Sequence, residues 1–424
     1  MEKGREELEE GLMEGEVDEE EVGETVLTLD DSQAPPDEDM EEEDEEEEPG
    51  NSQPQTPAHL ELAAHTGNVE LMPPLAASGG EDDRAFVFDI STGKPVLTCT
   101  GHKDSVTWVR ANGKRTLLAS GDMSGRIRIW RLADLQLEAE LDEASELEWL
   151  TWHHSADVLL AGCGDGSVWM WLVPTRDCKV FPGAAGVAST AGSLMGDGKR
   201  LLTGYADGSV ALWDLKKGLS TSIAASTSAN APVTATATAP SGQMGAVGWE
   251  DGGVGIVNAG SSRIEASFSL AGEDEAGCSV ESLAFSSDGA CLAAGGVNGV
   301  LGIWELGKTA LRHRLETGSG VVKVAWLAGR PEVVGGGLEG SVRVWDARSG
   351  EERAEWRCHE KELLDFALAE VEEMAEVECA HTIVRKTAKE ILCEVNTIFG
   401  SSLENVRDLA AGDALALLLK LTFP

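Results

Sequence analysis

Hydrophobic and polar residues alternate in short runs along most of the chain between about residue 58 and residue 370. The segments 125–130 and 340–345 show the pattern clearly, because each begins with glycine, alternates polar with apolar residues and ends in tryptophan. Alternation with a period of two residues is typical of a β-strand with one buried face. Glycine-rich stretches such as 335–337 separate the runs and favour tight turns. The pattern therefore predicts an all-β region built from many short strands.

These strands recur at a regular interval. A segment that ends in an aromatic residue returns about every 42 residues, at Phe88, Trp130, Trp171, Trp213, Trp304 and Trp345. The one long interval, from Trp213 to Trp304, is close to two repeats, and Val257 follows an Asp-Gly turn near its midpoint. A period of about 40 to 45 residues with such turns and a terminal Trp-Asp pair is the signature of a WD40 β-propeller. We therefore predict a propeller over residues 58–370, with seven recognisable blades and an incomplete eighth.

Both ends of the repeat array are irregular. Asp82 follows His65 by 17 positions, whereas Asp122 follows His102 by 20. Residues 73 and 74 are both proline where the first strand should finish, and proline fits poorly in a paired strand. After the seventh unit, His359–Glu370 predicts the opening strand of an eighth blade, but no Gly-Asp turn or tryptophan follows.

Residues 371–424 carry a different pattern. Their apolar positions predict amphipathic helices, the second from about Leu403 to Leu421. Two interpretations stay open. Either this helical tail replaces the eighth blade, or the sequence after about Glu370 reflects a gene model with a wrong last exon.

The acidic charge of the chain is concentrated at its N-terminal end. The protein has 75 Asp and Glu against 33 Lys and Arg, a net charge of −42, and residues 41–48 are an unbroken run of acids. Like charges at this density repel one another and bury nothing, so residues 1–57 are predicted to be a disordered acidic tail. Nucleic acid is a poor partner for such a chain, because phosphate binding depends on Lys and Arg. A basic protein is the expected partner.

The sequence offers little for catalysis or metal binding. The eight cysteines are scattered without a Cys-x-x-Cys pair or a histidine cluster, which favours reduced thiols in a cytoplasmic protein, with the nucleus as a second compartment. The N-terminus lacks the pattern of a secretory signal, and no run approaches the roughly 20 apolar residues of a membrane span. We expect a monomer without cofactor or metal, a non-enzyme, and no contact with membranes.

The second repeat holds four residues at the spacing of the hydrogen-bonded network that ties a WD40 blade together, namely His102, Ser120, Asp122 and Trp130. The aspartate should accept hydrogen bonds from the histidine and from backbone N–H groups, and the serine should bridge histidine and tryptophan. The same residue types could form a Ser-His-Asp catalytic triad, but their spacing within one repeat favours the structural role. Four further aspartates are predicted to hold the turn position in other repeats: Asp82, Asp165, Asp207 and Asp251.

The repeat register also predicts a binding rim. Propellers bind partners mainly on the face that carries the loops into the first strand of each blade and the turns between the second and third strands. At those positions the sequence offers Glu70, Glu81, Asp104, Glu148, Glu250, Glu281 and Glu362. Acids on one rim would steer a basic segment towards it. The competing interpretation is a solvated rim on a protein that is acidic throughout.

A second candidate site lies at the end of the seventh unit. Trp345, Asp346 and Arg348 match the W-D-x-R box with which substrate receptors of cullin-type ubiquitin ligases dock their adaptor. Asp-x-Arg after the tryptophan of a blade is also common in propellers that serve no ligase. A ligase receptor, a histone-binding propeller and a general interaction scaffold are therefore the alternative functions.

Several strings go beyond the general WD40 pattern, namely residues 78–87, 101–106, 121–125, 159–162, 169–174 and 364–368. Together they resemble the angio-associated migratory cell protein family, whose fungal counterpart is a ribosome-assembly chaperone. The resemblance covers about residues 60–370 and fails after about Glu370, where the family completes an eighth blade. It implies a cytoplasmic eight-bladed propeller that holds the basic N-terminal segment of a large-subunit ribosomal protein until that protein joins the pre-60S particle.

Overall fold

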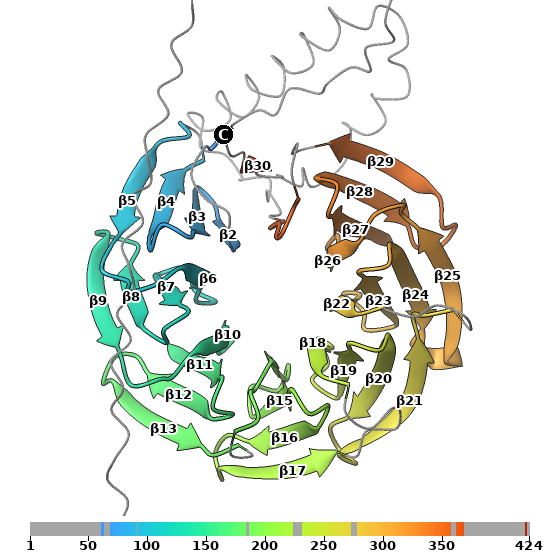
Figure 1. The fold of residues 1–424 in the computed structure, drawn as a ribbon, viewed down its shortest axis with the longest axis horizontal. Coiled ribbons are helices and arrows are strands. Elements are labelled where there is room, and N and C mark those ends of the chain that lie inside the picture. The colour runs from blue at the N-terminus through green and yellow to red at the C-terminus, as the bar shows by residue number, and fades with distance from the viewer. Residues whose placement is uncertain are drawn as a thin grey trace, which may run out of the picture. The chain divides into compact units, whose positions relative to one another are not determined.

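The computed structural model describes residues 61–62, 68–90, 92–183, 186–223, 231–272, 278–357, 362–368 and 420–421. Within these residues, seven four-stranded antiparallel sheets are arranged around a central axis as the blades of a propeller (Figure 1). In each blade the strands follow one another in sequence order from the innermost to the outermost. The predicted all-β propeller with seven recognisable blades is confirmed.

The first four blades are listed here from the innermost strand outwards. They comprise β2 (Val69–Met72), β3 (Leu75–Gly79), β4 (Ala85–Asp89) and β5 (Pro95–Cys99); β6 (Val106–Ala111), β7 (Leu117–Asp122), β8 (Ile127–Arg131) and β9 (Gln136–Leu141); β10 (Leu147–Trp152), β11 (Val158–Cys163), β12 (Val168–Leu172) and β13 (Asp177–Phe181); and β14 (Ala191–Leu194), β15 (Arg200–Gly204), β16 (Val210–Asp214) and β17 (Leu219–Ile223).

The remaining three blades have the same order. They comprise β18 (Val233–Thr238), β19 (Met244–Trp249), β20 (Gly253–Asn258) and β21 (Arg263–Ser269); β22 (Val280–Phe285), β23 (Cys291–Gly296), β24 (Val300–Glu305) and β25 (Ala310–Glu316); and β26 (Val321–Trp326), β27 (Glu332–Gly337), β28 (Ser341–Asp346) and β29 (Glu352–Arg357). A single 3-10 turn, η1 (Leu306–Lys308), joins β24 to β25 in the described chain.

The long interval between Trp213 and Trp304 contains a complete fifth blade, as predicted. Val257 is fully buried and pairs with Gly245, in the same way that Trp130 pairs with Leu118 in the second blade. An aliphatic side chain therefore fills the place of the aromatic anchor without loss of the sheet.

The core of the ring lies between neighbouring blades. Ile127 and Ile129 of the second blade, for example, belong to the same buried cluster as Leu147, Leu159 and Trp171 of the third. Burying an aliphatic side chain of this size stabilises a fold by about 1.5 to 3 kcal/mol. Each blade thus depends on its neighbours to cover its apolar faces.

The two prolines near the start of the ring lie in a turn. β2 ends at Met72, which pairs directly with Leu75, so Pro73 and Pro74 connect β2 to β3. Proline is tolerated here because the turn needs neither of their backbone N–H groups for the ladder. The first strand is therefore shortened rather than disrupted.

The predicted opening strand of an eighth blade, His359–Glu370, requires correction. Its described part, residues 362–368, forms no strand. This closing segment nevertheless lies at the inner edge of the ring between the seventh and first blades (Figure 1). Asp365 accepts a hydrogen bond from the backbone N–H of Val69 at 3.1 Å, just as Ser282 accepts one from Val324 between the sixth and seventh blades, also at 3.1 Å.

The closing segment therefore occupies the place of an innermost strand. It pairs with none of the described strands. Side-chain contacts to the two flanking blades hold it instead.

The C-terminal prediction is wrong at its last two residues. Lys420–Leu421 form strand β30, which pairs in parallel with β1 (Glu61–Leu62). A short apolar run cannot be assigned to helix or strand from periodicity alone. The remainder of the predicted helices and the acidic tail, residues 1–57, lie outside the described residues.

Among the described residues, one buried indole N–H has no hydrogen-bond partner. The indole N–H of Trp130 donates to Ser120 at 3.0 Å and that of Trp213 to Thr203 at 3.1 Å, whereas the buried Nε1 of Trp171 has no acceptor. The residue that corresponds to the acceptors Ser120 and Thr203 is Ala161, whose side chain carries no oxygen. An unsatisfied buried donor costs about 1 to 3 kcal/mol.

Replacing Ala161 with serine should therefore stabilise the protein. The new hydroxyl would accept from Trp171 and raise the free energy of unfolding by about 0.5 to 1.5 kcal/mol, measured by urea denaturation. Thr203→Ala is the converse control, because it should remove the hydrogen-bond acceptor of the Trp213 indole and lower the urea midpoint. An Ala161→Ser variant that is less stable than the parent would contradict this account.

Candidate binding rim on the loop face

The connections into the innermost strands and the turns between second and third strands lie on one face of the ring, called here the loop face. Backbone hydrogen bonds join a turn to a connection in successive blades. The N–H of Met123 bonds the carbonyl of Ser105 at 3.0 Å, and that of Gly164 bonds Glu146 at 2.8 Å. Equivalent bonds follow in the four later blades, from Ala206 to Ala188, from Glu250 to Pro232, from Val297 to Ser279 and from Leu338 to Gly320. The loop face is thus a continuous backbone framework.

Six of the seven predicted rim acids lie on this face. The turns contain Glu81 and Glu250. Asp104 and Glu362 lie in or beside the connections. The innermost strands contain Glu148 and Glu281. All are exposed except Glu148, which is half-buried.

The two strand acids owe their position to β-bulges. The pairing of β10 with β11 skips Glu148, and the pairing of β22 with β23 skips Glu281. A bulge inserts an unpaired residue and turns its side chain out of the regular alternation. These carboxylates therefore project at the mouth of the strand instead of entering the core.

A further acid, Glu146, lies close to Glu148 and was not predicted from the repeat register. Glu146 is exposed in the connection before β10, and a methyl group added to Gly164 would come 3.0 Å from its Oε2 and 3.6 Å from Oε1 of Glu148. Burial raises the pKa of Glu148, and the charge of Glu146 raises it further. A nearby cation would relieve this repulsion.

The register misplaced Glu70. This residue lies inside β2, where it pairs with Ala77 as Arg110 pairs with Ala119 in the next blade. Glu70 is five positions after His65, whereas Arg110 is eight after His102. Counting from His65, which lies outside the described residues, therefore places Glu70 at the start of the innermost strand although it lies further along that strand.

Glu70 faces the first blade's neighbours instead of the rim. Its carboxylate lies 3.8 Å from Nη1 of Arg110, and 27% of its side chain is exposed. Burial raises the pKa of Glu70, and the charges of Arg110 and Lys323 only partly offset this rise. Its place is an ionic cluster where the ring closes.

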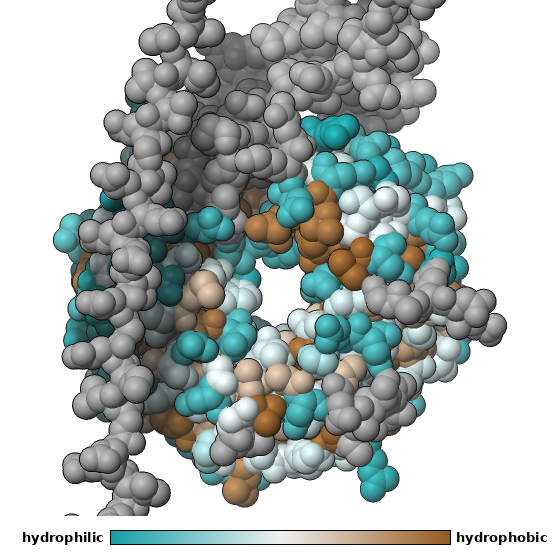
Figure 2. Space-filling model, viewed as in Figure 1, coloured by the Kyte–Doolittle hydropathy of each residue, from teal (hydrophilic) through white to brown (hydrophobic). Residues whose placement is uncertain are grey.

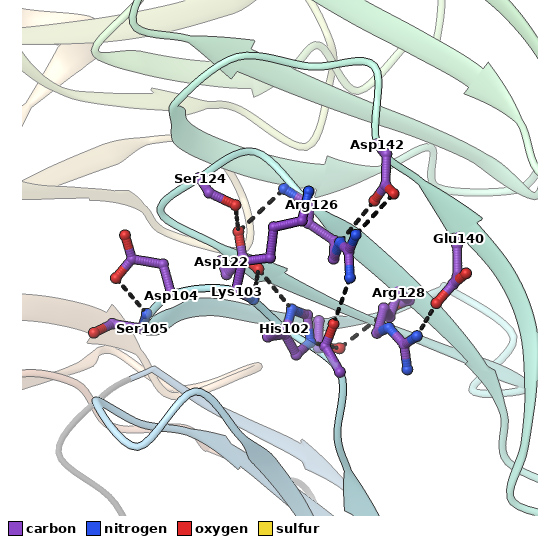
Figure 3. Close-up of polar contacts among 12 residues, drawn as sticks. His102, Lys103, Asp104, Ser105, Asp122, Ser124, Arg126, Arg128, Glu140 and Asp142 are labelled. Atoms are coloured by element: carbon purple, nitrogen blue, oxygen red, sulfur yellow. Dashed lines mark hydrogen bonds and ion pairs between the residues drawn. The ribbon is translucent and has the colours of Figure 1, made fainter.

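The predicted tetrad of the second blade is confirmed, and Figure 3 shows its His102 and Asp122. His102 Nδ1 lies 3.2 Å from Asp122 Oδ2, and its Nε2 lies 2.8 Å from Ser120 Oγ, which accepts from Trp130 at 3.0 Å. All four residues are buried. Burial alone would raise the pKa of Asp122, but hydrogen bonds from His102, Ser124 and two backbone N–H groups lower it to about 2.

The other turn aspartates do not occupy the position of Asp122. Asp165, Asp207 and Asp251 each accept the N–H two residues ahead at 2.9 Å, and they align with Ser124. Asp82 has the same alignment. The prediction that they share the turn position with Asp122 is therefore wrong. In the Gly-Asp-x-x-Gly turn of residues 121–125 the aspartate lies three positions before the last glycine, whereas in an Asp-Gly turn such as 165–166 it lies one position before it.

The W-D-x-R box serves a turn in this structure. Trp345 is buried, and Asp346 accepts the N–H of Arg348 at 2.8 Å and bonds Arg353 at 2.7 Å. Asp214 likewise accepts the N–H of Lys217 at 2.9 Å at the end of the fourth blade's third strand. Arg348 is exposed. Docking of a ligase adaptor stays a prediction.

The described part of the chain contains no group of three or more His, Cys, Asp or Glu placed to hold a metal ion. Four of its five cysteines are buried, and Cys178 is exposed. Burial raises the pKa of Cys99 to about 12, so this thiol is kept protonated. No described helix has the length and hydropathy needed to cross a membrane.

Comparison with known proteins shows the family of the chain. The family described as "WD domain, G-beta repeat" matches residues 93–131, 177–214 and 267–305. The human angio-associated migratory cell protein is 41% identical over 306 residues, which are 70% of either chain. The chain belongs to the angio-associated migratory cell protein family.

More distantly similar proteins share the fold. The yeast ribosome assembly protein SQT1 is 24% identical over 330 residues, covering 70% of this chain and 75% of that protein. The crystal structure of Saccharomyces cerevisiae Sqt1 has a TM-score of 0.68 at 22% identity, covering 76% of this chain and 93% of the other. Chaetomium thermophilum Sqt1 bound to the N-terminus of ribosomal protein L10 has a TM-score of 0.64 at 26% identity, with coverages of 73% and 94%.

The tetrad generates a pH-dependent stability. Because the pKa of Asp122 falls from 3.8 to about 2 on folding, its contribution is complete above pH about 4 and is lost as the pH falls through about 2. This corresponds to about 2 kcal/mol. Asp122→Asn should therefore lower the free energy of unfolding strongly at pH 6 and less at pH 3, measured by urea denaturation.

Asp104→Asn is the matched control, since it removes an exposed carboxylate from the same loop region. It should cost little at either pH. An Asp122→Asn penalty that does not shrink on acidification would show that the charge of Asp122 adds nothing to stability.

Proposed function

We propose that this protein is a non-catalytic chaperone of ribosome assembly. In this proposal its loop face holds the basic N-terminal segment of a large-subunit ribosomal protein, in the cytoplasm, until the segment is delivered to the assembling 60S particle. The supporting observation is a homologous propeller, Chaetomium thermophilum Sqt1, that was solved bound to the N-terminus of ribosomal protein L10. The similarity extends over 73% of this chain.

The charge of the loop face supports a basic ligand. Exposed carboxylates stand in the turns, in the connections and at the bulges of several blades, and Glu146 and Glu148 repel each other. Each exposed ion pair contributes only about 0.2 to 1 kcal/mol. Several of them on one face, however, add a long-range field that steers an Arg- and Lys-rich segment and speeds its association.

The geometry of the tetrad supports a role without catalysis. His102, Ser120 and Asp122 have the residue types of a catalytic triad, but they are buried and hydrogen-bonded within the second blade. Ser120 Oγ already accepts from Trp130. A buried serine that anchors a neighbouring indole is not placed to attack a substrate, since a nucleophile must reach the reacting atom.

Binding should be sensitive to both charge and salt. A fluorescent peptide with the N-terminal sequence of ribosomal protein L10 is titrated with the full chain, and anisotropy reports the Kd. The double variant Glu250→Lys/Glu281→Lys should weaken binding about tenfold or more at low salt, because it replaces two attractions by two repulsions. The effect should shrink as salt rises above about 0.15 M, where charges are screened beyond roughly 8 Å.

The control is Glu265→Lys/Glu352→Lys, which makes the same change in net charge on the outer strands β21 and β29. It should leave the Kd nearly unchanged. Equal weakening by both double variants would refute a binding site on the loop face. Failure of the unmodified chain to bind this peptide, together with tight binding of histone tails, would replace the ribosomal client by another basic one.

A further inference from the structure

The ring closes between its seventh and first blades through only a short segment. Every other described junction joins two four-stranded sheets, whereas the described elements outside those sheets are the closing segment, residues 362–368, and the two-residue pairing of β1 with β30. Figure 2 shows hydrophobic residues gathered beside the central opening in this part of the ring. Within the described residues, contacts of the closing segment link the seventh blade to the first.

One carboxylate joins both sides of this junction. Asp365 Oδ2 accepts from the side-chain amide of Asn68 at 2.7 Å and from the N–H of Val69 at 3.1 Å, both in the first blade. Asp365 Oδ1 forms an ion pair with Lys323 of the seventh blade. Only 8% of the Asp365 side chain is exposed. A charge-assisted hydrogen bond in such surroundings is stronger than a neutral one.

The apolar contacts of the closing segment are unequal on its two sides. Leu363 and Phe366 are buried against Val334, Val342 and Val344 of the seventh blade. On the first blade, Ala367 reaches a much smaller cluster built on Leu71 and Ala76. The segment is thus anchored on the seventh blade by packing, while its hold on the first blade depends heavily on Asp365.

We propose that residues 362–368 act as a closing device of the propeller, with Asp365 as the latch that holds the first blade. Loss of this carboxylate opens the ring between the first and seventh blades and leaves the segment packed on the seventh. Local opening of a fold occurs where few buried apolar contacts hold it, and on the first blade the described apolar contacts of this segment are few.

The latch also regulates the binding site, a step that rests on the proposed function. Glu362 belongs to the closing segment and Glu81 to the first blade, and both are exposed on the loop face. A basic segment that contacts both acids bridges the junction, so it binds the closed ring better than the open one. By linkage, binding then favours closure, and opening weakens binding by the same factor.

The test is amide hydrogen exchange on the full chain, comparing Asp365→Ala with Ser282→Ala. Ser282 accepts the N–H of Val324 in the equivalent position, but between two complete blades. Asp365→Ala should speed exchange at least tenfold in β2 and β3, with little change in β14–β21. Ser282→Ala should affect only the amides next to Val324.

A gentler variant covers the case in which Asp365→Ala does not fold. Asp365→Asn keeps an acceptor for Val69 but loses the charge that pairs with Lys323, and it should produce a smaller increase in the same strands. Two results with Asp365→Asn would refute the role of Asp365 as a latch. One is exchange in β2 and β3 at the parent rate, and the other is exchange that rises equally around the whole ring.

The second arm adds the L10 N-terminal peptide. If closure and binding are linked, the peptide slows exchange in β2 and β3 of the unmodified chain, and Asp365→Ala weakens its affinity whereas Ser282→Ala does not. Tight binding with unchanged exchange would overturn the coupling and leave the proposed function standing. Absence of binding would refute the proposed function, while the latch would still be judged by the peptide-free exchange rates.

Discussion

A four-stranded sheet has two apolar faces, and a blade of this protein can bury them only against its two neighbours. This constraint governs the whole molecule. Clusters such as the one that joins Ile127 and Ile129 to Leu159 and Trp171 cross from blade to blade, so no blade has a core of its own. The ring must close on itself, and where a complete sheet is not described beside the first blade, residues 362–368 cover part of its face.

The same packing leaves the loop face free to vary. Backbone hydrogen bonds between turns and connections fix its framework, such as the bond from Gly164 to Glu146, so the exposed side chains can change without loss of the fold. Acids collect there at turns and at bulges. A rigid scaffold that presents variable side chains is suited to binding, and bulges extend the available positions into strands that would otherwise contribute only to the core.

Much of this architecture could be predicted from the sequence because the repeat is long, regular and anchored by buried aromatics. The tetrad of the second blade was predictable from spacing alone. Glu70 was misplaced because the first repeat has a different length before its innermost strand, and Glu146 was missed because the rim position of the third repeat was assigned to Glu148, two positions later. The part played by Asp365 depends on contacts with Asn68, 297 positions away, which no local pattern encodes.

The order of the strands has a consequence for synthesis. Every described blade is built from four consecutive strands, and none exchanges a strand with a blade elsewhere in the chain. Contacts within a blade are therefore local in sequence, which favours fast formation. As the chain leaves the ribosome, each blade can form and cover the exposed face of the one before it, from the N-terminal end onwards. The contacts between the first blade and residues 362–368, such as the bond from Val69 to Asp365, can form only after all seven blades have been made, so ring closure is a late step in the maturation of the propeller.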